Sequence, residues 1–95
     1  MTEQDERIRG ADAEQLLKNK LLVEALETIE TNVVDRMATP DLQPAEILRM
    51  QAILTGKRAF ERYLRGIVTT GRMAAQMAQE EEKKRTLMDR FKRSA

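Results

Sequence analysis

A Gly-Lys pair beside a cluster of arginines is the first stretch of this sequence whose residues could do chemistry. It lies in "ILTGKRAFERYLRG", residues 53–66. A phosphate-binding loop of this type needs a glycine at position 51, a serine or threonine at position 58 and a preceding strand. Positions 51 and 58 are Gln and Arg, and the surrounding pattern is helical. We therefore interpret Gly56 as a helix glycine beside a surface lysine.

A row of arginines on the same predicted helix could hold phosphates. Its members follow helical spacing and are Arg58, Arg62, Arg65 and Arg72. Such a row fits nucleic-acid contact, but it also fits ion pairs with acids of a neighbouring helix or of another subunit. The acids in question are Glu24, Glu27, Glu30 and Asp35. We favour pairing or solvation, because the net charge is only +1 and three aromatic residues offer little for base stacking.

The rest of the sequence contains few residues that could catalyse a reaction or bind a metal. The chain has no cysteine and no histidine, which excludes disulfides, thiolate metal sites and histidine proton shuttles. In "EEEKKR", residues 80–85, adjacent glutamates point in different directions and cannot converge on one ion. We interpret this run as a solvated helix face with Glu80–Lys84 and Glu81–Arg85 pairs. We expect no catalytic residue, metal, cofactor or small-molecule substrate, and no enzyme activity.

Length and charge distribution point towards association with other chains. A chain of 95 residues supports one small domain that needs help for stability, and without disulfides or metal that help is self-association. Residues 11–38 carry six acids against three bases, whereas residues 45–72 carry two acids against six bases. No apolar run approaches the length of a membrane span or signal peptide. We expect a cytosolic protein without membrane contact.

Apolar spacing predicts two long helices. Leu22, Leu26, Ile29 and Val33 recur at intervals of 4, 3 and 4, which predicts a helix over about 12–38 that starts at Asp12. Asn19 could end a short first helix and cap a second one. The turn "ATPDLQPAE" follows, with Pro44 suited to the first turn of a second helix over about 45–70. A short turn makes the two helices antiparallel neighbours.

The second helix carries its own apolar stripe and several weak points. Lys57 occupies one position in the stripe, whose apolar members are Met50, Ile53, Phe60, Leu64 and Ile67. Glycines at 56, 66 and 71 each cost about 1 kcal/mol in a helix, a cost that close approach of another helix can justify. "VTTG", residues 68–71, predicts a bend near Thr70. Beyond it the chain has high helix propensity and a thin apolar edge.

The predicted fold class is therefore all-α. We expect an antiparallel helical hairpin over residues 12–71, a flexible segment at 1–11 and a charged helical C-terminal tail at 72–95, completed by oligomerisation. The side chains expected in helix packing or in the oligomer interface are Leu22, Leu26, Ile29, Val33, Ile53, Phe60, Leu64 and Ile67.

Two segments together carry a family resemblance. "AEQLLKNKLLVEALETIETNVVDRM" and, after the proline-containing turn, "ILRMQAILTGKRAFERYLRGIVTTGRMA" resemble small helical-hairpin proteins encoded in the morphogenesis gene clusters of tailed bacteriophages and prophages. The matching features are "LL.N.LL.EAL..IE", "L....R.F..YL...V.TG.MA" and the turn between them. The resemblance covers roughly residues 13–75. Its motifs are packing patterns, so no functional residue is carried over.

The resemblance implies virion assembly or DNA packaging, in the host cytoplasm or incorporated in the virion. The leading interpretation is a non-enzymatic virion-assembly protein that contacts copies of itself or other phage structural proteins through coiled-coil-like helix faces. One alternative is a DNA-packaging accessory that resembles the core of a small terminase subunit and uses the arginine row on DNA. A further alternative is a helical chaperone or adaptor.

Overall fold

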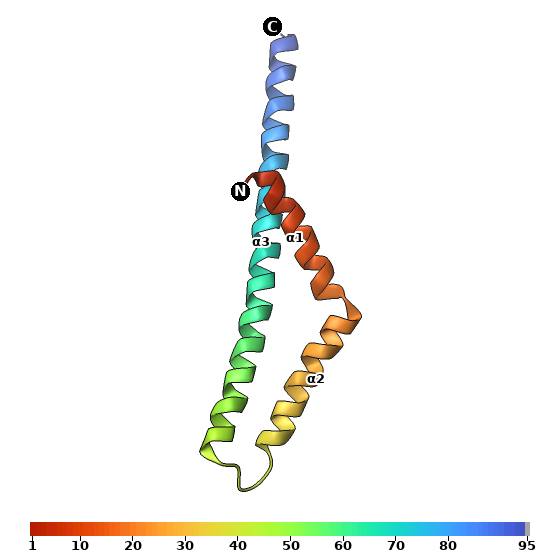
Figure 1. The fold of residues 1–95 in the computed structure, drawn as a ribbon. Coiled ribbons are helices and arrows are strands. Elements are labelled where there is room, and N and C mark those ends of the chain that lie inside the picture. The colour runs from red at the N-terminus through yellow and green to blue at the C-terminus, as the bar shows by residue number, and fades with distance from the viewer. Residues whose placement is uncertain (95) are drawn as a thin grey trace.

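Three helices make up the protein in the computed structural model, which describes residues 1–94 (Figure 1). They are α1 (Glu3–Lys18), α2 (Lys20–Met37) and α3 (Pro44–Ser94). No strand occurs in these 94 residues, which confirms the predicted all-α class. The molecule is long and narrow, with extents of 81 × 24 × 20 Å.

The N-terminal segment is helical, which differs from the flexible stretch expected at residues 1–11. The α1 helix begins at Glu3 rather than at Asp12. Thr2 caps it: its Oγ1 accepts a hydrogen bond from the Asp5 amide at 3.2 Å, and its own amide donates to the Asp5 carboxylate at 3.2 Å. This reciprocal arrangement satisfies two amides that would otherwise lack partners. Acidic residues in the first turn add a favourable interaction with the helix dipole.

Asn19 separates α1 from α2, as the sequence suggested. Its backbone is extended, with φ −68° and ψ 118°, so the helical path is interrupted at this residue. Its side-chain oxygen accepts a hydrogen bond from the amide of Leu22 at 3.0 Å and thereby caps α2. Figure 1 shows α1 and α2 as an arm that bends away from α3 at this point. The single helix expected over 12–38 is therefore two helices.

The α3 helix begins at Pro44, as predicted, and then runs without interruption for 51 residues. Asp41, in the preceding turn, adopts a left-handed conformation with φ 65°, which aspartate tolerates better than most residues. The bend expected near Thr70 is wrong. The Thr69 hydroxyl donates to the carbonyl of Arg65 at 3.0 Å, and the Gly71 that follows is packed against another helix.

Two glycines meet where α1 crosses α3. A Cβ atom built on Gly10 would lie 2.8 Å from the Cα of Gly71, and one built on Gly71 would lie 2.7 Å from the Cα of Gly10 and 2.9 Å from the carbonyl oxygen of Glu6. The backbones therefore touch directly, and any side chain at either position would hold them apart. Gly56 and Gly66, by contrast, have no atom within 4 Å of such a Cβ. Only Gly71 of the three glycines in α3 fulfils the expected packing role.

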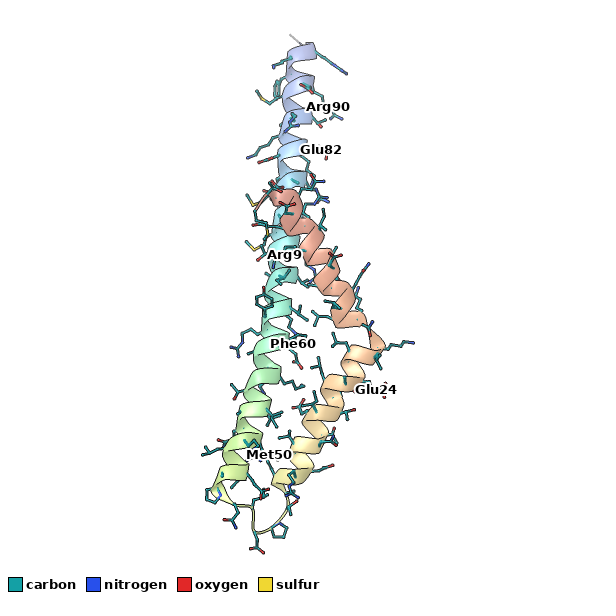
Figure 2. All side chains as sticks on the ribbon, in the orientation of Figure 1. Arg9, Glu24, Met50, Phe60, Glu82 and Arg90 are labelled. Atoms are coloured by element: carbon teal, nitrogen blue, oxygen red, sulfur yellow. The ribbon has the colours of Figure 1, made fainter. Side chains whose placement is uncertain are left out.

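The apolar core lies beside this crossing and is small. Ala13 of α1 packs with Leu64 and Val68 of α3, and Leu17 and Ile67 cover them. The α2 helix touches α3 mainly near the interhelical turn, where Val33 is buried. Figure 2 shows side chains projecting into solvent along most of α3, including the whole segment beyond the start of α1. The arm therefore depends on α1 for most of its apolar contact with α3.

The glycine crossing predicts opposite effects for one substitution at two sites. Gly71→Ala should destabilise the protein by about 1–3 kcal/mol, because the new methyl group needs space that the α1 backbone occupies. Gly56→Ala should stabilise it by about 0.5–1 kcal/mol, because alanine is the better helix former and meets nothing there. Urea denaturation followed by circular dichroism measures both. A stabilising Gly71→Ala would show that the helices do not cross at this residue.

Candidate interaction surface

The face that α3 turns towards the arm follows a regular 4 and 3 spacing. We call it the inner seam; it consists of Met50, Leu54, Lys57, Glu61, Leu64 and Val68, all buried or half-buried. Sequence reasoning placed Met50, Lys57 and Leu64 in the packed stripe but chose Ile53 and Phe60 as their neighbours. Because Lys57 and Glu61 interrupt the apolar spacing of the inner seam, the sequence pattern does not distinguish this face of the helix from the adjacent one as the packed face.

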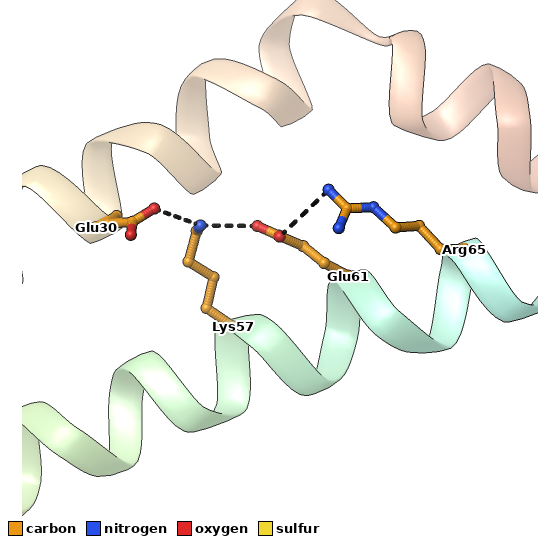
Figure 3. Close-up of polar contacts among 4 residues, drawn as sticks. All are labelled: Glu30, Lys57, Glu61 and Arg65. Atoms are coloured by element: carbon orange, nitrogen blue, oxygen red, sulfur yellow. Dashed lines mark hydrogen bonds and ion pairs between the residues drawn. The ribbon is translucent and has the colours of Figure 1, made fainter.

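The charged centre of the inner seam links α2 to α3 (Figure 3). The Lys57 ammonium group donates to the Glu30 carboxylate at 2.8 Å and lies 2.7 Å from that of Glu61, which in turn lies 3.8 Å from the Arg65 guanidinium. The Lys57 side chain is only 10% exposed. A lysine held this closely needs its two carboxylates to compensate for lost hydration.

These contacts change the proton affinities of the groups involved. The hydrogen bond from Lys57 lowers the pKa of Glu30 below its ordinary value. The hydrogen bond to Glu30, followed by that to Glu61, raises the pKa of Lys57 above its ordinary value. Both shifts mean that the charged forms are favoured in the folded chain. The cluster therefore acts as an ionic link between the two helices, and the pKa shifts of Glu30 and Lys57 both move away from neutral pH.

Two further ion pairs join the arm to α3, one on each side of the Lys57 cluster. Arg72 donates to Glu14 of α1 at 2.9 Å, close to the glycine crossing. This contact is the main reason that the pKa of Glu14 is lowered, and a contact with Lys18 adds to it. At the other end, Arg36 of α2 donates to Glu46 of α3 at 3.0 Å. The arm is thus held to α3 by one ion pair from α1 and two from α2.

The arginine row divides into paired and unpaired members. Arg72 pairs with Glu14 of α1, and Arg65 pairs with Glu61 of its own helix. Arg58 and Arg62 are exposed and form no ion pair among residues 1–94, although the charge of Arg58 acts weakly on Glu30. Of the four acids expected to face the row, only Glu30 forms an ion pair in the described chain, and its partner is Lys57.

The eight residues expected in helix packing are distributed over all degrees of exposure. Val33 and Leu64 are buried, and Leu22, Leu26 and Ile67 are half-buried. The remaining three are exposed in the single chain: Ile29 at 40%, Ile53 at 41% and Phe60 at 44%. The bend at Asn19 turns Ile29 away from α3, and the register of the inner seam turns Ile53 and Phe60 away from the arm. A role for these residues in an oligomer interface stays a prediction.

A second face of α3 carries no charge and was missed by sequence reasoning. We call it the outer seam; it consists of Ala52, Gly56, Ala59, Tyr63, Gly66, Thr70, Met73 and Met77, all exposed. Its spacing of 4 and 3 is that of the contact line in a coiled coil, and it lies on the side of α3 away from the inner seam. Small residues alternate with larger ones, so the face is shaped for another helix. The signal available in the sequence was the lack of charged residues at every position of this spacing from 52 to 77.

Metal and membrane sites find no support in the described chain. Among residues 1–94 no group of three carboxylates is placed to hold a metal ion. No helix in this range is both long enough and apolar enough to cross a membrane.

The ionic link predicts a pH-dependent loss of stability in one variant. Because the pKa of Glu30 is lowered in the folded chain, its contribution is present above its ordinary value of 4.5 and is lost as the pH falls through the lowered value. Glu30→Gln should therefore reduce the free energy of unfolding at pH 7, and the difference from the native chain should vanish in acid. Urea titrations across this range measure it. Glu27→Gln, at an exposed position of α2 without an ion pair, is the control and should show no such trend. Equal stability of Glu30→Gln and the native chain at pH 7 would show that the link contributes nothing.

Comparisons with known proteins identify no relative: no protein-family model, no curated protein and no solved structure matches this chain. The resemblance to phage helical-hairpin proteins therefore remains an expectation from the sequence pattern. Function has to be argued from the surfaces described above.

Proposed function

We propose that this protein is a non-enzymatic assembly protein that acts through helix–helix contacts and associates with copies of itself along α3. The observation that carries the proposal is the uncharged outer face of that helix. Tyr63, Met73 and Met77 on it are each more than half exposed, at 64%, 58% and 57%. An apolar line of this length is costly to keep in water, and a partner helix would cover it.

The shape of the chain supports this proposal. A compact protein of this length has a radius of gyration of about 12–13 Å, whereas this chain has 22.0 Å. Its core consists of a few small and medium side chains at one crossing, and none of the described side chains is completely buried. A chain with so little internal apolar contact gains stability from a partner.

An enzyme is the less suitable interpretation of this surface. The hollows beside the crossing, such as the one lined by Gln4, Gly10, Val68 and Ala75, are open to solvent. Catalysis generally uses a site that excludes water, with groups whose pKa lies near neutrality. The resolved pKa shifts move Glu14, Glu30 and Lys57 away from neutrality. Contact with other proteins needs none of these features.

The setting that we propose is particle assembly in a tailed bacteriophage. Its support is the resemblance of residues 13–75 to helical-hairpin proteins of phage morphogenesis clusters, together with the helical, elongated form of the chain. Partners would be copies of this chain or other phage structural proteins. The protein would act in the host cytoplasm or become part of the virion.

DNA packaging is the second candidate, and one observation favours it. Arg58 and Arg62 lie one turn apart on α3, exposed and without an ion pair among the described residues. Two such guanidinium groups could contact neighbouring phosphates of a duplex. Pairing of Arg65 and Arg72 with glutamates leaves only half of the predicted row for this purpose.

Self-association is tested by the mass of the protein in solution. The native chain should exceed the 10.9 kDa of a monomer in light scattering coupled to size exclusion. Met77→Glu places a charge on the exposed apolar face and should return the protein to a monomer with unchanged helix content. Gln79→Glu adds the same charge two residues away, on another side of α3, and should behave as the native chain. A native chain that is monomeric at high micromolar concentration contradicts the proposal.

The DNA alternative predicts a salt-dependent affinity that we do not expect to find. If Arg58 and Arg62 hold phosphates, the affinity for duplex DNA should fall with salt at a log–log slope of about 0.9 per phosphate neutralised. Reversal of both arginines to glutamate should then abolish binding, while Lys20→Glu, on exposed α2 surface, should not. We expect negligible binding at physiological salt. Measured binding that is lost only in the arginine variant would favour the packaging function.

A further inference from the structure

The last part of α3 is a single helix that lies beyond the arm, with residues 79–93 exposed. Ala78 is the last half-buried residue, and residues 79–93 are all exposed. Figures 1 and 2 show this part of α3 extending beyond the N-terminal end of α1. Leu87 and Phe91 are 55% and 67% exposed. A helix gains most of its stability from packing of an apolar face, so a partner that packs against this segment would stabilise it.

The charged run at residues 80–85 forms no ion pair among the described residues. The acids Glu80 and Glu81 are followed four residues later by Lys84 and Arg85, which is the spacing for pairs within a helix. The ion pairs of this spacing in the described chain are Glu14–Lys18, Lys57–Glu61 and Glu61–Arg65, and the pairs expected in the run 80–85 are not formed. An acidic block followed directly by a basic block is therefore available to another molecule.

Apolar and charged residues fall on one line of contact. We call it the tail seam; it consists of Met73, Met77, Glu80, Lys84, Leu87 and Phe91. The intervals of 4 and 3 alternate strictly, as at the contact positions of a coiled coil. Two apolar residues thus precede the charged centre, and two follow it.

We propose that the partner of the tail seam is a second copy of the same segment, antiparallel to the first, with the two-fold axis beside Glu82. This inference rests on the self-association proposed above and specifies its geometry. In such a dimer Met73 meets Phe91 of the other chain, Met77 meets Leu87, and Glu80 meets Lys84. All three pairs are centred on position 82, so one two-fold axis satisfies them together, and each pair occurs twice.

The opposite orientation is disfavoured by the same residues. In a parallel dimer in register, Glu80 would face Glu80 and Lys84 would face Lys84, and like charges across a helix interface are repulsive. The antiparallel arrangement replaces these contacts with opposite charges. It also places the methionine sulfur of Met73 against the ring of Phe91, a contact favourable for both groups.

The rest of the molecule leaves room for this partner. At the crossing, α1 covers the side of α3 that carries Gly71 and Ala75. Met73 follows Gly71 by two residues, which turns it about 200° around the helix from the crossing, whereas Met77 is bordered by the buried Ala74 and the half-buried Ala78 and is itself exposed. Their exposure of 58% and 57% agrees with this position. A second helix can therefore lie along the tail seam without displacing α1.

Cysteine cross-linking tests the orientation and the register, because the chain contains no cysteine of its own. We would prepare Met77→Cys and Leu87→Cys separately, oxidise each mildly, and oxidise an equal mixture. In the proposed dimer the two different positions face each other, whereas identical positions lie about 15 Å apart along the axis, beyond disulfide reach. The mixture should therefore form a disulfide-linked dimer and neither variant alone should.

Charge exchange tests the pairing at the centre of the tail seam. Glu80→Lys and Lys84→Glu should each weaken dimerisation by about tenfold or more, because each creates like-charge contacts between chains. An equal mixture of the two variants should recover the native affinity as a heterodimer. If the substitutions acted only by removing a Glu80–Lys84 interaction within one helix, mixing the two variants would not restore the affinity. Recovery of the affinity therefore shows that the two residues are in contact between chains.

The outcomes separate this inference from the proposed function. Cross-linking of the mixture alone, together with recovery on mixing charges, supports the antiparallel dimer. Cross-linking of Met77→Cys or Leu87→Cys with itself overturns the orientation or the register. A native chain that associates without any of these cross-links overturns the tail seam but leaves self-association standing. A monomeric chain overturns both.

Discussion

The contact between Gly10 and Gly71 is the constraint on which the rest of this structure depends. Because neither residue has a side chain, the backbone of α1 can lie directly on that of α3. That approach brings Ala13 against Leu64 and Val68 and forms the apolar cluster beside the crossing. It also places Glu14 within 2.9 Å of Arg72. Separation of the two glycines would remove the packing and the ion pair together.

This constraint also decides which face of α3 remains for other molecules. With α1 fixed across Gly71, and with α2 tied to α3 by Glu30 and Lys57, the charged inner seam faces the arm. The uncharged outer seam then faces solvent, and the exposed residues 79–93 of α3 extend past the arm (Figure 1). One face of α3 is thus packed against the arm and the opposite face is exposed, which suits the proposed assembly function. This arrangement combines limited stability of the single chain with a long line of contact for a partner.

Local sequence signals predicted the local structure well. Asn19 could be recognised as a break and Pro44 as a helix start, because both act through their own backbone and immediate neighbours. The cap formed by Thr2 and Asp5 was equally readable and was passed over in favour of Asp12. Long-range contacts were less accessible. Gly71 contacts α1 and Gly56 does not, because the contact is made by Gly10, which is far away along the chain. Ile53 and Phe60 lie outside the inner seam because Lys57 and Glu61 occupy it.

The direct test of the central contact is a nuclear Overhauser measurement on protein labelled with ¹³C only in glycine. The chain has four glycines, so the spectrum is simple. The crossing predicts one cross peak between the α-protons of two different glycines, Gly10 and Gly71. Gly56 and Gly66 should show none, since nothing lies within 4 Å of the position of their missing side chains. Absence of the Gly10–Gly71 cross peak from the folded protein would contradict this account of how the molecule is held together.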